Sequence, residues 1–174
     1  MANEPSVSWY EYVSEIDAAQ GTRPLSMWQL NTVEADGNSD LTLKKFIIWN
    51  NKSGTQAAQT MRNCTIGTRD TSGGFNQPLV KERWVKGHFP VGANPFAIGA
   101  VDNAGVLTAV EMPIKAASSA AATGTVEGNI NDGNMATAGN DKNYSIFQLR
   151  MVVPASSGAG LVQAKLRVGY EITG

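Results

Sequence analysis

The most regular feature of this sequence is an alternation of apolar side chains close to its C-terminus. Apolar residues occupy every second position from Val162 to Ile172, and most positions between them are polar or charged. The same period of two is present from Phe147 to Val153. This period is typical of β-strands, because successive side chains of a strand point to opposite faces. We therefore predict two strands, each with one buried face.

The segment between these two predicted strands contains Pro154, Gly158 and Gly160. Proline ends a strand that must donate its N–H groups, and glycine accepts the backbone angles of turns. We predict that the two strands pair as a hairpin that closes the fold. Leu166 is expected on its buried face, where replacement by alanine would cost about 2–5 kcal/mol.

Shorter runs with strand character fill much of the remaining chain. Residues 46–49 are apolar at both parities, which indicates a central strand with little solvent on either face. Residues 61–70 alternate and end at the turn sequence Thr-Ser-Gly-Gly. Further strands are predicted at 27–32, 96–101 and 106–114. Together these runs predict an all-β protein, a single antiparallel β-sandwich of the Ig-like or jelly-roll-like kind.

Two segments stand apart from the predicted sandwich, which we assign to residues 26–174. Residues 1–25 form an N-terminal arm with Trp9, Tyr10 and Tyr12, and such an arm either packs on its own domain or docks on a neighbouring subunit. Residues 115–143 are mostly small and polar, without an apolar stripe at helical spacing. We predict a long surface loop there, with one short strand around 125–130.

The charge and the sequence ends exclude several classes of partner. The chain has a net charge of −1 and is 17% charged, whereas binding to nucleic-acid phosphates needs clustered Lys and Arg. No run approaches the ~18 apolar residues of a membrane span. The N-terminus lacks the basic start and apolar region of a signal peptide. We expect a protein made in the cytosol that binds neither nucleic acid nor membrane.

Residues that carry chemistry are scarce, and we predict no enzyme and no cofactor. His88 is the sole histidine and Cys64 the sole cysteine, which leaves too few ligands for zinc and nothing that places a catalytic pair together. Cys64 is predicted to be a small buried residue. The segment 127–134 resembles a calcium loop, but Ala138 stands where the closing glutamate is required.

The four tryptophans raise the alternative of a carbohydrate-binding surface, because flat rings stack on sugar faces. Trp28 and Trp49 lie in apolar runs and are predicted to be in the core. Trp84 is less certain. Trp9 is the best candidate for a surface contact, with a partner subunit as the expected target.

One stretch resembles a segment of uncharacterised structural proteins of tailed bacteriophages and prophage-like particles. The stretch is LTLKKFIIWNNKSGTQAAQTMRNCTIGTRDTSGG, an apolar strand that ends in Trp-Asn-Asn, followed by Met-x-Asn-Cys-Thr-Ile-x-Thr-x-Asp and a glycine pair. The stretches EPSVSWYEYVS and VVPASSGAGLVQAKLRVGYEI are similar to those proteins as well. The resemblance covers most of the chain except residues 115–143.

The resemblance implies a virion component of the tail or baseplate module, without catalytic residues. We expect a homo-oligomer at a tail, baseplate or fibre-attachment site, in contact with copies of itself and with other virion proteins. A capsid decoration protein and a carbohydrate-binding host-recognition module are the alternatives. The candidate subunit contacts are the 115–143 loop and four aromatic residues, Trp9, Tyr10, Tyr12 and Trp84.

Overall fold

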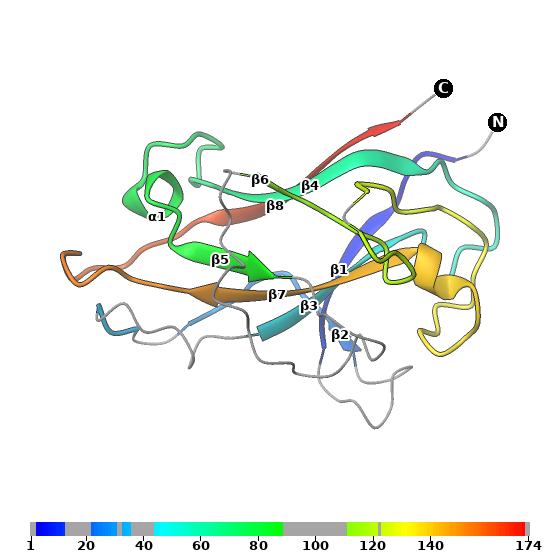
Figure 1. Cartoon of the computed structure of the whole chain (residues 1–174), viewed down its shortest axis with the longest axis horizontal. Coiled ribbons are helices and arrows are strands. Elements are labelled where there is room, and N and C mark those ends of the chain that lie inside the picture. Colours follow the sequence, from blue (N-terminus) through cyan, green and yellow to red (C-terminus); the bar gives the residue numbers. More distant parts are fainter. Residues whose placement is uncertain are drawn as a thin grey trace.

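The structure is a computed structural model, which describes residues 3–12, 22–30, 33–35, 44–88, 111–121 and 123–172. In this part of the chain two antiparallel sheets pack face to face, as the upper and lower layers of Figure 1. The predicted all-β sandwich is therefore confirmed. Both chain ends lie toward the same side of the molecule (Figure 1).

The larger sheet has five strands in the order β2-β1-β3-β7-β5, and the smaller sheet has three in the order β6-β4-β8. The strands of the larger sheet are β1 Val7–Tyr12, β2 Thr22–Pro24, β3 Lys44–Asn50, β5 Val85–His88 and β7 Tyr144–Met151. The strands of the smaller sheet are β4 Met61–Arg69, β6 Glu111–Pro113 and β8 Lys165–Ile172. Among the described residues two short helices, α1 Pro78–Lys81 and η2 Asn140–Lys142, connect strands.

Strand β3 is the centre of the larger sheet and is buried on both faces, as its sequence predicted. Phe46 and Ile48 point into the core between the sheets, and Ile47 and Trp49 belong to a second apolar cluster on the opposite face. All four side chains are fully buried. A strand with neighbours on both sides and apolar cover on both faces has no position for a polar side chain between its ends.

The predicted C-terminal hairpin is wrong, because its two strands lie in different sheets. Strand β7 pairs with β3 and β5, whereas β8 pairs with β4. The connection between them crosses from one layer of the sandwich to the other (Figure 1). Alternation fixes which side chains share a face of a strand, but it does not fix which strand lies alongside.

The predicted buried face of β8 is also only partly buried. Leu166 and Val168 are half-buried against the core, while Tyr170 and Ile172 are 40% and 44% exposed. The cost of 2–5 kcal/mol expected for Leu166→Ala is therefore too large, since that range belongs to fully buried side chains.

The segment assigned to an N-terminal arm contains a strand of the larger sheet. Strand β1 pairs with β3 over Val7 to Glu11 and with β2 on its other side. The described part of residues 1–25 thus packs on its own domain, the first of the two alternatives. The strand predicted at 27–32 is absent from Met27–Leu30, and the strand predicted at 96–101 lies outside the described residues. The strand predicted at 106–114 is described only from residue 111, where β6 occupies Glu111–Pro113.

Residues 115–143 form a loop as predicted, but this loop is firmly attached to the sandwich. The predicted short strand is reduced to one bridge, in which Met61 and Val126 exchange two backbone hydrogen bonds of 3.0 Å. Val126 is fully buried and Met135 packs on the second apolar cluster. We expected subunit contacts here because the loop seemed to offer little to bury, and these two residues remove that reason.

Asparagine side chains hold this loop against the end of β3. The Asn50 amide donates to the carbonyl oxygens of Gln59 at 3.0 Å and Val126 at 3.3 Å. The Asn51 amide donates to the carbonyl oxygen of Gly128 at 3.0 Å, and the Asn131 amide donates back to the carbonyl oxygen of Asn51 at 2.7 Å. The two asparagines therefore have a structural role, because their side-chain amides add hydrogen bonds to backbone carbonyls of the loop and of the segment before β4.

Candidate functional site

The sole cysteine, Cys64, and the sole histidine, His88, lie in strands of different sheets. Cys64 is fully buried, as predicted, and desolvation raises the pKa of its thiol to about 11. The thiol is therefore protonated at neutral pH and is a poor nucleophile. His88 ends β5, and its side chain lies outside the description. Among the described residues no three His, Cys, Asp or Glu side chains come together as metal ligands.

The calcium-like segment uses its oxygen atoms for hydrogen bonds within the loop and to the turn that follows β3. The Asn131 Oδ1 atom accepts from the backbone N–H groups of Ser53 and Gly133. The Asp132 carboxylate accepts from the backbone N–H of Asn134 at 2.9 Å, and also from the side chains of Thr137 and Asn140. These donors hold the pKa of Asp132 below its usual range. The segment is a set of side-chain-capped turns.

The three aromatic residues proposed as contacts near the N-terminus lie on both faces of β1. Trp9 is half-buried on the core face, where its ring meets the ring of Phe147 edge-on at a centroid distance of 6.0 Å. Tyr10 and Tyr12 pack against the second apolar cluster. Lys52 Nζ lies 3.9 Å from the centre of the Tyr10 ring. These side chains therefore do not form one continuous aromatic surface.

Trp84, the fourth candidate contact, is a core residue. It is only 6% exposed, and its indole N–H donates to Glu82 Oε2 at 3.1 Å. A side chain buried in its own domain has little surface left to offer a neighbouring subunit. The sequence did not reveal this burial, because Trp84 follows the helix α1 and stands outside any alternating run.

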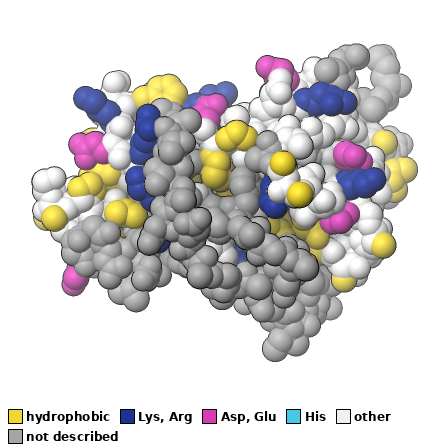
Figure 2. Space-filling model, viewed as in Figure 1, with side chains coloured by type: hydrophobic (Ala, Val, Ile, Leu, Met, Phe, Trp, Pro, Cys, Tyr) yellow, Lys and Arg dark blue, Asp and Glu magenta, His cyan; other side chains and the backbone are white. Residues whose placement is uncertain are grey.

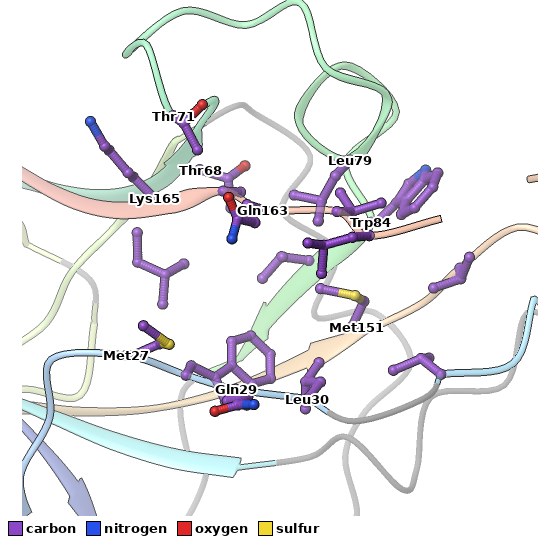
Figure 3. Close-up of a pocket in the computed structure, with 18 of the residues that line it drawn as sticks. Met27, Gln29, Leu30, Thr68, Thr71, Leu79, Trp84, Met151, Gln163 and Lys165 are labelled. Carbon is purple, nitrogen blue, oxygen red and sulfur yellow. The ribbon is translucent and has the colours of Figure 1, made fainter. Parts of the chain in front are cut away.

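A groove of about 840 Å³ opens between residues 25–30, 33 and 35 on one side and residues 157–166 on the other. In Figure 3 Met27, Gln29 and Leu30 lie on one side of it, with Gln163, Lys165 and Thr68 on the other. Its walls are mainly apolar, and Lys165 is the single charged residue among the described residues that line it. The groove contains parts of three tryptophans that are far apart in the sequence, Trp9, Trp28 and Trp84.

The rim of this groove exposes large apolar side chains. Met27 and Leu161 are 71% and 90% exposed, and Val162 follows at the same rim. Figure 2 shows hydrophobic side chains at the left end of the visible face, where Figure 1 places the connection between β7 and β8. The pair Leu161-Val162 follows a Gly- and Ser-rich segment, and it is the signal by which the sequence could have indicated this rim.

A second feature is the β8 edge, the side of strand β8 that faces away from β4. Strand β8 ends the smaller sheet, and no described strand pairs with it there. Its core-side face is only partly covered toward the C-terminus, at Tyr170 and Ile172. Unpaired edge strands present free N–H and C=O groups to other chains. The candidate functional site is therefore the β8 edge together with the rim of the groove.

The outer face of the smaller sheet carries charged residues in ordered contacts. Arg69 forms an ion pair with Glu111, and this contact, followed by weaker ones that include Thr65, lowers the pKa of the Glu111 carboxyl. On β8 the Glu171 carboxylate accepts a hydrogen bond of 2.7 Å from the side-chain amide of Asn63. The position of Glu171 at the β8 edge is thus held by the neighbouring strand.

Comparisons with known proteins identified no relative of this chain. Neither a protein-family model, nor a curated protein, nor a solved structure matches this chain. The described residues include no helix with the length and hydrophobicity of a membrane span.

Proposed function

We propose that this chain is a non-enzymatic structural protein of a virion, which works as a homo-oligomer in a phage tail, baseplate or fibre-attachment region. The observation that carries the proposal is the β8 edge, where a strand without a second partner among the described strands exposes Tyr170 and Ile172. Proteins that remain monomers usually protect such edges with bulges, charged residues or covering loops. On β8 the charged residues Lys165, Arg167 and Glu171 all lie on the outer face, whereas the core-side face exposes apolar side chains. Such an edge is suited to repeated contacts between subunits, because a partner strand can use both kinds of side chain.

The composition supports the same proposal. Only 17% of the residues are charged, and small polar residues are abundant. Burying small polar groups in an interface costs less free energy than burying charges. The resemblance to structural proteins of tailed phages is the reason for proposing a phage particle. Such a particle would assemble in the cytoplasm of its host.

The test is the composition of purified particles from a host strain that encodes this chain. We expect mass spectrometry to find the chain as a stoichiometric component after density-gradient purification. Gold-labelled antibodies in electron microscopy would then separate a tail or baseplate position from a capsid surface, where a decoration protein would lie. Absence of the chain from all particles would overturn the proposal.

A carbohydrate-binding function is the second candidate, and the groove favours it. Trp9, Trp28 and Trp84 line one cavity, together with Gln29 and Gln163 as hydrogen-bonding side chains. Trp28 is the best probe, because it is half-buried and its indole N–H has no hydrogen-bond partner among the described residues. This candidate predicts saturable binding to cell-wall glycans that Trp28→Ala abolishes and Tyr10→Ala, outside the groove, leaves unchanged. A glycan array without a bound sugar would remove it.

A further inference from the structure

We infer that two copies of this chain pair through their β8 edges, antiparallel, about a twofold axis at Val168. The two smaller sheets then become one continuous sheet that crosses the interface. This inference rests on the proposed function and deepens it, because it names the partner of the β8 edge as a second copy. The order of charged and apolar residues along β8 supports this pairing.

The symmetry of such a pair fixes which residues face one another. A twofold axis perpendicular to the sheet relates two antiparallel edge strands and keeps each face of the sheet on the same side. With the axis at Val168, residues at equal distances before and after Val168 stand opposite each other in the two copies. Directly opposite residues in an antiparallel pair have Cβ atoms about 4.5–5.5 Å apart, which is close enough for their side chains to interact.

On the outer face this register brings opposite charges together. Lys165 of one copy faces Glu171 of the other, and the symmetry repeats this pair at the other end of the interface. Arg167 faces Gly169, whose lack of a side chain leaves room for the arginine, and Glu171 is the diagonal neighbour of Arg167. An axis at Arg167 would instead place two arginines directly opposite each other, which is destabilising.

On the inner face the same register joins the exposed apolar residues to the core. Leu166 of one copy faces Tyr170 of the other, and Val168 faces its own symmetry mate. Tyr170, which is 40% exposed in the single chain, is then covered by the half-buried Leu166. Apolar surface leaves water at the position where the edge strands gain backbone hydrogen bonds.

A twofold pair would cover the exposed β8 edge of both copies. In a twofold contact both copies use the same surface, so that each β8 edge is satisfied by the other and no further copy can add there. The pairing therefore consumes the edge without producing a fibre through it.

Cysteine cross-linking tests the register directly. Lys165→Cys and Glu171→Cys are both at exposed positions of β8, and Cys64 can stay in place because it is fully buried. Within one variant the two new thiols of a pair would be separated by six positions along the strand, about 20 Å. We therefore expect little cross-linking of either variant alone, and an oxidised dimer when the two variants are refolded together as a mixture.

The matched control is Arg62→Cys, which is exposed on the neighbouring strand β4. Mixed with Lys165→Cys, it should give no dimer. Equal cross-linking with this control, or cross-linking of Glu171→Cys with itself, would overturn the inferred register.

Charge reversal tests the same contact without cysteines. We expect Lys165→Glu to weaken dimerisation in sedimentation equilibrium by roughly tenfold, because two favourable pairs become two repulsive ones. The double variant Lys165→Glu with Glu171→Lys should recover most of the loss. Melting temperatures of all variants would show that each is folded.

Failure of this inference is distinguishable from failure of the proposed function. A native chain that is monomeric at about 100 µM, or one that associates without any response to these variants, overturns pairing through β8. The presence of the chain in purified particles is scored by a separate measurement, which neither result changes.

Discussion

Gly128 in the long loop is in backbone contact with Ala58, the residue that leads toward strand β4. The N–H of Ala58 donates to the carbonyl oxygen of Gly128 at 2.8 Å, and a β-carbon on Gly128 would lie 2.4 Å from the carbonyl oxygen of Ala58. Only glycine allows the two backbones to approach in this way. This contact, together with the asparagine side chains near it, fixes the loop to the sandwich.

We predict that Gly128→Ala lowers the free energy of unfolding by about 1–3 kcal/mol, the usual cost of overpacking a tight contact. Urea denaturation followed by tryptophan fluorescence measures this change. Gly158→Ala is the matched control, because nothing lies within 4 Å of a β-carbon there. A change of less than about 0.5 kcal/mol is expected for it. Equal losses of unfolding free energy in the two variants would show that Gly128 does not lie in tight contact with Ala58.

Two leucines, one in the core and one at the groove rim, differ strongly in their exposure. Leu149 in β7 is 1% exposed, whereas Leu161 at the rim is 90% exposed. We expect Leu149→Ala to cost about 2–5 kcal/mol of unfolding free energy, because it removes buried methyl groups and leaves a cavity. Leu161→Ala should change it by less than about 0.5 kcal/mol. Thermal unfolding of the two variants under the same conditions tests whether Leu149 is buried and Leu161 is exposed.

The buried thiol of Cys64 predicts a loss of stability in alkali. Its pKa is raised from 9.0 to about 11 on folding, so that between these values the unfolded chain releases a proton that the folded chain keeps. In this window the unfolded chain binds fewer protons than the folded chain. The free energy of unfolding therefore falls as the pH rises through it. Cys64→Ala should make the slope of the unfolding free energy against pH less steep, by the equivalent of up to about one bound proton.

Urea titrations at a series of pH values between 8 and 11 measure this slope for the native chain and the variant. Tyr144, whose pKa is raised to about 12, adds a similar loss that begins at higher pH. The native thiol should also resist alkylation at pH 8 and react rapidly in urea. Fast alkylation of the folded chain would show that Cys64 is accessible.

Asp132 predicts an acid response that is confined to the loop. Its carboxylate accepts three hydrogen bonds in the folded chain, which lowers its pKa. The stabilisation from these bonds is present above the ordinary pKa of aspartate and is lost as the pH falls through the lowered value. We expect faster hydrogen exchange of the amides in residues 132–140 as the pH is lowered, after correction for intrinsic rates.

Two substitutions of Asp132 separate its charge from its shape. Asp132→Asn keeps an oxygen acceptor and should exchange at a rate that depends little on acid, whereas Asp132→Ala should exchange faster at every pH. Unchanged exchange in Asp132→Ala would mean that the other contacts of the loop are sufficient to order it.

The sequence carried the information on faces and burial. The apolar run of β3 predicted a central strand, and the alternation in β4 predicted a buried Cys64. The small polar residues of 115–143 predicted a loop, although not the buried contacts of Val126 and Met135. These properties are local, because the pleat of a strand and the solvation of a side chain depend mainly on neighbouring residues.

The sequence did not carry the pairing of the strands. Residues 147–153 and 162–172 have the same alternation, and a close turn between them seemed to make a hairpin, yet the two strands belong to opposite sheets. Likewise nothing in the local sequence placed β1 between β2 and β3 or brought Met27 to the same groove as Leu161. The β8 edge became visible only with these pairings.

Sequence alone thus determined that this chain is a β-sandwich and which side chains it buries in its central strand. The tertiary structure decided which strand ends the smaller sheet, and therefore which residues are available to a second copy. The physical reason is that every residue type except proline offers the same backbone donor and acceptor to a neighbouring strand, so that partners are selected by packing across the whole domain.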